Sequence, residues 1–362
     1  MHFMSDNAGP VAPAVMEALM RANAGHAAPY GAEAAMERVT ERLRALFEAP
    51  EAAVYLVGTG TAANALILAT LTRPWQAVFC HRNAHVEEDE CGAPEFFTGG
   101  AKLVLLEGEN GKIDPESLDR ALAGTGDKGV HGVQHGPLSL TQATEKGTIY
   151  TPDEIRALCD RAHARGLPCH MDGARFANAL VSLGCSPAEM SWKAGVDALS
   201  FGGTKNGLMG VEAVIFFDPG HAWEFELRRK RGAHLFSKHR YLSAQMEAYL
   251  EGDLWLDLAR RANAAAARLE AGIRQIEGGF LQYPRGANIL FAGWPRAGHK
   301  RAQAEGAAYY LWPFGQVLEG PETAPVTARL VCNWATEDAD IDRFLTLIGQ
   351  RPAAPDPAQG GA

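Results

Sequence analysis

Hydrophobic residues recur at two spacings along roughly the first 250 residues of the chain. Positions such as Met36, Val39 and Leu43 are spaced as on one face of a helix, and short apolar runs typical of buried strands follow them. The pattern predicts helices at 36–47 and 62–71, and strands at 53–57, 77–80, 103–106, 137–141, 167–171, 198–201 and 213–217. Alternating strands and helices predict right-handed crossovers and a mostly parallel sheet flanked by helices, the α/β class.

The segment from Thr151 carries the clearest helix start in the chain. Thr151 suits the N-cap position, Pro152 suits the first helical position, and Glu154 completes a capping box. Gly166 stands where this helix is expected to end, and the predicted strand at 167–171 follows at once.

The pattern changes after about residue 250. Four further elements are predicted there: a helix at 253–277, strands at 288–292 and 328–333, and a helix from Thr336. We therefore expect a large α/β domain over residues 1–250, which includes the N-terminal segment, and a smaller α+β domain over residues 251–350. Residues 351–362 are mostly proline, alanine and glycine with little to bury, so this tail is predicted to be disordered.

Composition and charge narrow the class of protein. The 362 residues are 47% hydrophobic, as in ordinary globular proteins, and the net charge of −9 argues against a nucleic-acid binder. No apolar run approaches the roughly 18 residues of a membrane helix, and no secretory signal is recognisable. The six cysteines form no C-x-x-C pair, so we expect buried thiols in a reducing cytoplasm and neither a disulfide framework nor a metal site.

The first candidate for chemistry is the loop Gly58-Thr59-Gly60-Thr61, between a predicted strand and a predicted helix. Its backbone N–H groups and the positive end of the helix would suit a bound phosphate. With Ala63 the loop also satisfies the permissive dinucleotide fingerprint G-x-G-x-x-A. The next strand ends in Arg82 rather than an acid, so only the phosphorylated ribose of NADP would fit. No lysine follows the glycines, which excludes a Walker loop, and a glycine-rich turn without a ligand stays open.

Two reactive side chains follow predicted strands. Asp172 stands at the carboxyl end of a predicted strand, where open α/β sheets bind ligands. The structural alternative is that Asp172 caps the next helix. Lys205 lies among glycines, where a lysine can lose its proton and form an imine, or serve as an ordinary loop lysine. Pyridoxal phosphate needs N–H donors for its phosphate, a carboxylate for its ring nitrogen and an amine for its aldehyde. The three motifs together predict this cofactor.

The same order of motifs is found in one known family. The stretches concerned are Phe3-Met4-Ser5-Asp6, Pro29-Tyr30-Gly31, Gly58 to Asn64, His85 with Glu90-Cys91-Gly92, Thr141 to Thr148, His170 to Arg175, Gly203 to Asn206, and Arg329. Over roughly residues 3–347 the chain resembles the low-specificity L-threonine aldolases, fold type I pyridoxal-phosphate enzymes of the aspartate-aminotransferase superfamily. The resemblance implies cleavage of L-threonine, L-allo-threonine and related β-hydroxy amino acids, such as phenylserine, to glycine and an aldehyde.

For the cofactor, the resemblance implies a covalent link to Lys205, a pairing of Asp172 with the ring nitrogen, and a ring stacked on His85. These three are the expected catalytic residues. The loop Gly58-Thr59-Gly60 would bind the phosphate, and Arg175 is expected beside the cofactor as well as the substrate.

For the substrate, the resemblance implies that Ser5, Arg175 and Arg329 grip the carboxylate, since the planar fork of arginine matches a carboxylate. Where many relatives have Asn-Thr-His, this chain has Gln142-Ala143-Thr144. The base that takes the β-hydroxyl proton is therefore left open between His85, a water held by Thr144, and Glu90 acting through water.

The resemblance also implies a homodimer or homotetramer with shared active sites. Tyr30 would lie near the site of a neighbouring subunit, and Arg231 and Lys238 would reach across towards the phosphate. The run 228–231 could equally be a solvated helix face. Two other functions stay open: another pyridoxal-phosphate reaction, either β-elimination or amino transfer, and an NADP-binding oxidoreductase built on the Gly58 loop.

Overall fold

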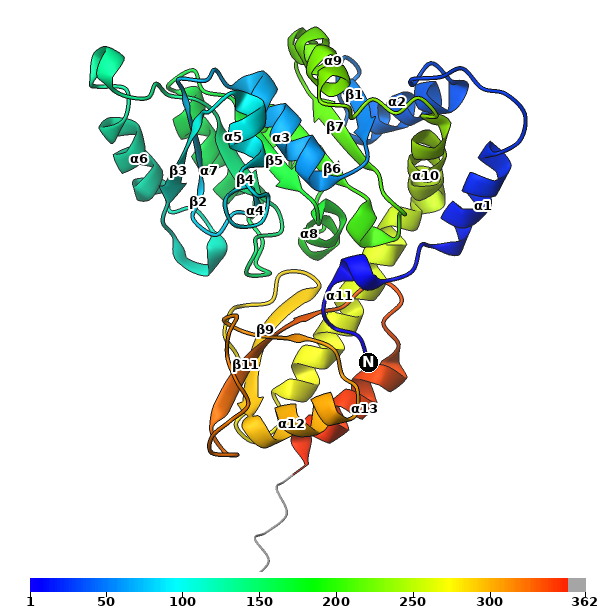
Figure 1. Cartoon of the computed structure of the whole chain (residues 1–362), viewed down its shortest axis with the longest axis vertical. Coiled ribbons are helices and arrows are strands. Elements are labelled where there is room, and N and C mark those ends of the chain that lie inside the picture. Colours follow the sequence, from blue (N-terminus) through cyan, green and yellow to red (C-terminus); the bar gives the residue numbers. More distant parts are fainter. Residues whose placement is uncertain (351–362) are drawn as a thin grey trace, which may run out of the picture.

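The larger of two sheets contains the seven strands predicted in the first 250 residues. They are β1 (Ala53–Val57), β2 (Ala77–His81), β3 (Lys102–Leu106), β4 (Leu138–Thr141), β5 (Cys169–Gly173), β6 (Ala198–Gly202) and β7 (Glu212–Phe216). Their order is β1-β7-β6-β5-β4-β2-β3, and β2 to β6 run parallel, which confirms a mostly parallel sheet (Figure 1). This computed structural model describes residues 1–350, and the predicted tail at 351–362 lies outside the described residues.

β7 runs antiparallel to both of its neighbours, β1 and β6. Only residues 203–211 separate the end of β6 from the start of β7. A parallel crossover needs about a dozen residues or more, so the chain turns straight back instead. The turn carries Lys205.

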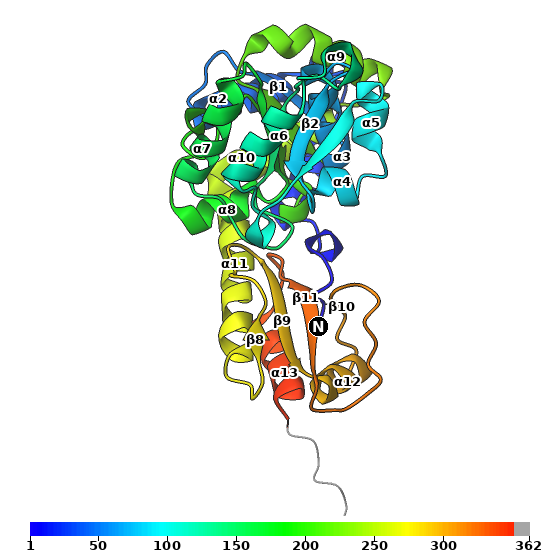
Figure 2. The same ribbon diagram turned by 90° about the vertical axis from the view of Figure 1, so that its left-hand side faces the viewer.

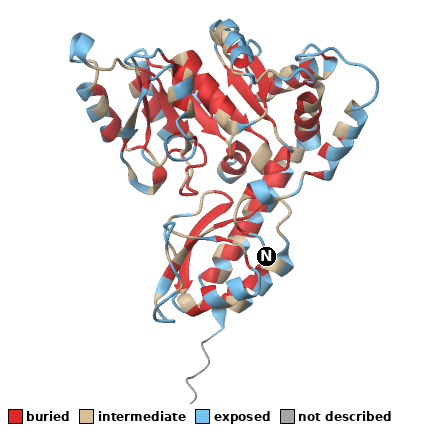
Figure 3. Ribbon diagram, in the orientation of Figure 1, coloured by how far each residue is buried: buried red, intermediate tan, exposed pale blue. Residues whose placement is uncertain are grey.

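Helices cover both faces of this sheet. They are α1 (Pro13–Ala22), α2 (Ala34–Leu46), α3 (Gly60–Leu71), α4 (His85–Glu88), α5 (Ala93–Thr98), α6 (Pro115–Gly124), α7 (Pro152–His163), α8 (Phe176–Leu183), α9 (Ala222–Arg231) and α10 (Arg240–Leu250). Successive residues of β1 alternate between two cores: Val54 and Leu56 pack on the side of α2, α7 and α10, whereas Tyr55 and Val57 pack on the side of α3 and α9. The strands are therefore buried on both faces, as Figure 3 shows.

The smaller sheet is antiparallel and has the order β10-β11-β9-β8. Its strands are β8 (Phe280–Leu281), β9 (Ile289–Pro295), β10 (Tyr310–Leu311) and β11 (Pro325–Val331), and its helices are α11 (Leu254–Ile273), α12 (Arg296–Ala304) and α13 (Asp338–Gly349). The three helices share one core with β9 and β11. α11 leads from the larger lobe into the smaller one (Figure 2). Within residues 1–350, none of the helices has the length and apolar character needed to cross a lipid bilayer.

The N-terminal segment joins both lobes. The N–H of Phe3 donates to the Ala308 carbonyl at 2.8 Å, and the N–H of Val331 donates to the Phe3 carbonyl at 2.9 Å. Phe3 thus extends the small sheet and is buried there, whereas the sequence placed this segment with the large domain. A few residues later the N–H of Ala12 donates to the Gly207 carbonyl in the larger lobe at 2.9 Å. We keep the boundary near residue 250 as a proposal for the rest of the chain.

Candidate functional site

A cavity of about 360 Å³ opens at the carboxyl ends of β5 and β6. Its lining comprises Asn7, Gly58, Thr59, Gly60, Thr61, Asn64, His85, Asp172, Ala174, Thr204, Lys205 and Glu212. Six of these residues were predicted from the sequence as site residues: Gly58, Thr59, Gly60, His85, Asp172 and Lys205. Residues up to 147 positions apart in the chain therefore meet at one edge of the sheet, where ligands of such folds bind.

The glycine-rich loop ends in the N-terminus of α3. Thr59 is the N-cap, and its Oγ1 accepts a hydrogen bond from the Ala62 N–H at 3.1 Å. The helix therefore begins at Gly60, two residues earlier than the apolar pattern predicted. Its first N–H groups have no backbone acceptor within the helix and form the positive end of the helix dipole. The loop can hold an anionic group such as a phosphate.

Asp172 is buried at the end of β5 and held from two sides. Its Oδ2 accepts from Nδ2 of Asn64 at 2.9 Å, and its Oδ1 accepts from the Ala174 N–H at 3.0 Å. Burial acts to raise the pKa of Asp172, but the nearby charges of His85 and Lys205 prevail and lower the pKa below its ordinary value. Asp172 is therefore an anion that can keep a proton on a ring nitrogen.

Asn64 is a central residue of the site to which the sequence assigned no role. Its Nδ2 also donates to Oε1 of Glu90 at 2.9 Å, and its Oδ1 accepts from Oγ of Ser200 at 2.7 Å. One amide thus connects the carboxylates of Asp172 and Glu90. A polar residue in the otherwise apolar α3 was the available signal, because a buried amide requires partners.

His85 lies at the start of α4, with Nδ1 at 2.8 Å from Oε1 of the buried Glu90. Burial lowers the pKa of His85, but the hydrogen bond to Glu90 and the charge of Asp172 outweigh it, so the pKa is raised overall. Burial also raises the pKa of Glu90. His85 can therefore take up a proton beside the cavity, because Glu90 stabilises the resulting charge.

The two predicted carboxylate-binding arginines differ in what they already bind. Arg175 is buried, and its Nε and Nη2 donate to both carboxylate oxygens of Asp6 at 2.7 and 2.9 Å, so its fork is occupied. Oδ2 of Asp6 also accepts from Nδ2 of Asn288 at 3.1 Å. Arg329 donates from Nη1 to the Met4 carbonyl at 3.2 Å, and none of the ion pairs within residues 1–350 includes it. Neither Ser5 nor the two arginines are among the residues that line the cavity, and Arg329, which contacts Met4, has the less occupied guanidinium group.

Thr144 is not among the residues that line the cavity. Its Oγ1 lies 2.8 Å from Oγ1 of Thr148 and donates to the Asn110 carbonyl at 3.3 Å. This hydroxyl stabilises its own loop and is fully buried there. The Thr144 hydroxyl is thus engaged within its own loop, and its role in holding a water stays a prediction.

Three residues expected to act across a subunit boundary also lie outside the cavity. Tyr30 is 48% exposed, and the Nζ of Lys230 lies 4.8 Å from the centre of its ring. Arg231, at the end of α9, and Lys238 are both exposed. One chain alone does not bring Tyr30, Arg231 or Lys238 to its own site, and their role in a neighbouring site stays a prediction.

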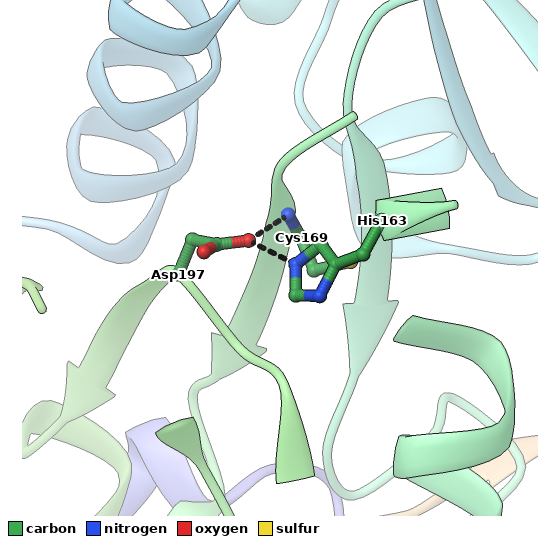
Figure 4. Close-up of side chains that lie close together, drawn as sticks. All are labelled: His163, Cys169 and Asp197. Carbon is green, nitrogen blue, oxygen red and sulfur yellow. Dashed lines mark hydrogen bonds and ion pairs between the residues drawn. The ribbon is translucent and has the colours of Figure 1, made fainter. Parts of the chain in front are cut away.

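A cluster of possible metal ligands outside the cavity lies at the opposite ends of the strands. It consists of His163, Cys169 and Asp197 (Figure 4). Oδ2 of Asp197 accepts from the Cys169 N–H at 2.7 Å and lies 2.8 Å from Nε2 of His163. These contacts tie the end of α7 to the starts of β5 and β6, which is a structural role. We assign no metal to the cluster.

Comparisons with known proteins agree with this geometry. The family model of the beta-eliminating lyases matches residues 2–291. The low-specificity L-threonine aldolase of Pseudomonas aeruginosa is 42% identical over 346 residues, which cover 95% of each chain. The low-specificity L-threonine aldolase of Pseudomonas sp. strain NCIMB 10558 is 39% identical over 346 residues, which cover 96% of each chain.

Solved structures extend the similarity to the fold. A threonine aldolase of Leishmania major superposes with a TM-score of 0.88 at 26% identity, covering 96% of this chain and 98% of the other. The serine palmitoyltransferase of Sphingomonas wittichii, with a TM-score of 0.69 at 14% identity, shares the fold alone. The predicted fold of the pyridoxal-phosphate transferases is thereby confirmed. The chain belongs to the beta-eliminating lyase family and, within it, to the low-specificity L-threonine aldolases.

Proposed function

We propose that the protein cleaves L-threonine, L-allo-threonine and related β-hydroxy amino acids, such as phenylserine, to glycine and an aldehyde, with pyridoxal phosphate as cofactor. One observation carries the proposal: Lys205, Asp172 and the N-terminus of α3 line a single cavity. These are the amine, the carboxylate and the anion site that this cofactor requires. Family membership supports the same reaction.

The residues present fit pyridoxal phosphate. Lys205 would bind its aldehyde carbon, Asp172 would keep its ring nitrogen protonated, and the loop Gly58-Thr59-Gly60 would hold its phosphate. The imidazole of His85 would lie against its ring. When bound, the cofactor supplies an electron sink for the bond that breaks at Cα. Asp172 serves this purpose because it stays an anion under burial.

Arg329 and Ser5 would bind the substrate carboxylate, and Arg175 would orient the site through Asp6. Burial and the positive charge of Arg175 lower the pKa of Arg329. An anionic substrate would relieve this unfavourable charge balance, so its binding is favoured. Fixing the carboxylate orients the Cα–Cβ bond, which selects the bond that breaks.

His85 would take the proton of the β-hydroxyl on Nε2, because Nδ1 is engaged with Glu90. Of the three bases left open by the sequence, the water on Thr144 loses its support since that hydroxyl is bound within its loop. Glu90 would stabilise the charged imidazole through its contact with Nδ1. Cα must gain one proton after the bond breaks before the product is glycine, and Lys205 would hold the cofactor between turnovers.

The NADP-binding oxidoreductase is not favoured. The Arg82 side chain, which would have to hold the phosphorylated ribose, is exposed and forms an ion pair with Glu107. It is also absent from the lining of the cavity at the Gly58 loop. That function would in addition leave Lys205 and Asp172 unused.

We also propose a cytoplasmic homodimer or homotetramer in which neighbouring subunits share active sites. Tyr30, Arg231 and Lys238 support this assembly. All three are exposed on a single chain. In the assembly they would lie close to the cofactor site of the neighbouring subunit.

The test is a comparison of wild-type protein with Lys205→Ala. The wild type should show a visible absorbance band that borohydride bleaches, and should release acetaldehyde and glycine from threonine. Lys205→Ala should lose both, whereas the matched control Lys193→Ala, an exposed surface lysine, should keep both. Full aldol cleavage by Lys205→Ala would refute the proposal. Pyruvate and ammonia from serine, or a 2-oxo acid from threonine, as the main product would indicate β-elimination or amino transfer instead.

A further inference from the structure

Glu212 lies between the two loops that form the proposed cofactor site. It is the first residue of β7, and its register partners are Val57 at the end of β1 and Gly202 at the end of β6. The glycine-rich loop begins one residue after Val57, and the turn that carries Lys205 begins one residue after Gly202. Glu212 is also one of the residues that line the cavity.

The surroundings of Glu212 are unusual for a carboxyl group. Glu212 is only 6% exposed, and the other four residues of β7 are buried as well. Those four residues are all apolar. None of the ion pairs formed within residues 1–350 includes it. Burying a carboxylate without such a partner is unfavourable, so packing alone would suit an apolar side chain better.

The contact that Glu212 does make is with the lysine turn. Its Oε2 accepts a hydrogen bond from the Gly203 N–H at 2.7 Å. The turn is the short 3-10 segment Thr204–Asn206, whose N-cap Gly203 offers no side chain, so the bond from the Gly203 N–H to Glu212 helps to anchor it to the sheet. Removing the acceptor would leave a buried N–H unpaired and the turn less fixed.

The charged and titratable groups that face Glu212 come from three elements: Lys205 of the turn, Asp172 of β5 and Tyr249 of α10. Burial raises the pKa of Glu212 to about 7, although the Thr204 hydroxyl, the Gly203 N–H and the charge of Lys205 oppose the rise, while Asp172 adds to it. Interaction between two titrating groups is reciprocal, so a charged Glu212 must favour a positive nitrogen on Lys205.

We propose that Glu212 is a positioning residue that fixes the turn of Lys205 and, through its own charge, sets the charge state of the Lys205 nitrogen. This inference rests on the proposed function for the role of Lys205 in holding the cofactor. Glu212 belongs to none of the sequence motifs, and none of the groups that pyridoxal phosphate requires is a second carboxylate.

The test uses two substitutions that separate anchoring from charge. Glu212→Gln keeps an oxygen that can accept from Gly203 but can never be charged, and Glu212→Leu removes both properties. In Glu212→Gln holoenzyme, we expect the pH midpoint of the visible band to fall by about half a unit or more, because the positive nitrogen loses its support. Glu212→Leu should show the same shift and, in addition, release the cofactor faster.

A matched control is Glu247→Gln, which removes one carboxylate far from the cavity, at an ion pair with Arg38. Its midpoint should equal that of the wild type. A midpoint in Glu212→Gln that also equals the wild type would overturn the proposal, and would leave Glu212 as an acceptor for Gly203 only.

A second measurement separates this inference from the proposed function. In the full chain without cofactor, acetylation of Lys205 by acetic anhydride is followed against pH by peptide mass spectrometry, with Lys193 as the internal reference. The labelling midpoint of Lys205, relative to Lys193, should be lower in Glu212→Gln than in the wild type. If the wild-type protein binds no pyridoxal phosphate, the proposed function is refuted. The difference in labelling midpoint between Glu212→Gln and wild type would still test the role of Glu212. An unchanged labelling midpoint would refute the inference while cofactor binding stood.

Discussion

Arg175 and Arg329 show how the partners of a side chain decide its role. Arg175 is buried and Arg329 is partly buried, and both were predicted to bind the substrate carboxylate. Arg175 is neutralised by Asp6 through two hydrogen bonds, whereas Arg329 has a carbonyl oxygen as its partner. A substrate carboxylate therefore gains more from Arg329 than from Arg175.

We predict that Arg329→Lys raises KM for threonine by at least about tenfold, because lysine cannot form the two parallel hydrogen bonds of the guanidinium group. A loss of about 1.5 kcal/mol, the lower end for a charged hydrogen bond, corresponds to that factor. Steady-state kinetics would measure it. Arg260→Lys, at an exposed ion pair with Asp257, is the control and should leave KM unchanged. An unaltered KM in Arg329→Lys would assign the carboxylate to another residue.

At this scale the sequence could indicate the residues whose type is itself the chemistry, such as Lys205 and Asp172. We assigned no role in the site to Asn64, Asp6 or Glu212 from the sequence. Their roles follow from partners distant in the chain: Asn64 bonds Asp172 across 108 positions and Asp6 bonds Arg175 across 169. Such pairings depend on the register of strands, which a linear pattern does not contain.

Among the elements, α7 is the one whose start the sequence specified best. The Glu154 N–H donates to Oγ1 of Thr151 at 3.2 Å, and the Thr151 N–H donates to Oε2 of Glu154 at 2.7 Å. The predicted capping box is confirmed, because all its partners lie within one turn of the chain.

We predict that Thr151→Ala lowers the free energy of unfolding by about 1 kcal/mol, the usual effect of losing an N-cap hydroxyl. Urea denaturation followed by circular dichroism would measure the change. Thr151→Ser retains the hydroxyl and should stay close to the wild type. Equal stability of Thr151→Ala and wild type would show that the cap contributes nothing here.

Elements without a local signal were missed. The hydrophobic pattern did not predict α9, since this helix buries only Phe225 and Arg229, and only the basic run 228–231 in its last turn indicated a possible helix face. The direction of β7 was also beyond the pattern, because an apolar run reads the same for parallel and antiparallel strands. The short turn before it decides the direction, through its length.

For the molecule as a whole, each lobe contains a buried histidine. In the larger lobe His170 lies within β5, and burial lowers its pKa to about 4. In the smaller lobe burial likewise lowers the pKa of His299 to about 4, and its ring stacks on Trp294 at 4.0 Å between centres. Both imidazoles are therefore neutral in the folded protein near pH 7.

We predict that stability falls as the pH is lowered from about 6.5 towards 4. The unfolded histidine binds a proton near pH 6.5, whereas the folded one resists it until about pH 4, so acid favours the unfolded state in this window. Each histidine should contribute a loss of about 2 kcal/mol between pH 7 and pH 5. Denaturant unfolding at the two pH values would measure it.

The matched variant is His299→Gln, which cannot take up the proton. It should lose less stability than the wild type over the same pH interval, whatever its stability at pH 7. If the two proteins lose the same amount, His299 does not resist protonation in the folded state.

The docking of Phe3 against Ala308 and Val331 has a consequence for the order of folding. During synthesis, Phe3 is added to the chain more than 300 residues before its partner Val331. The small lobe therefore cannot complete its core until nearly the whole chain has been made, while β1 to β7 can already assemble. Closing so long a loop is a late step, and contacts of such sequence separation slow folding. The segment that holds Asp6 against Arg175 is thus among the first to be made and among the last to reach its place.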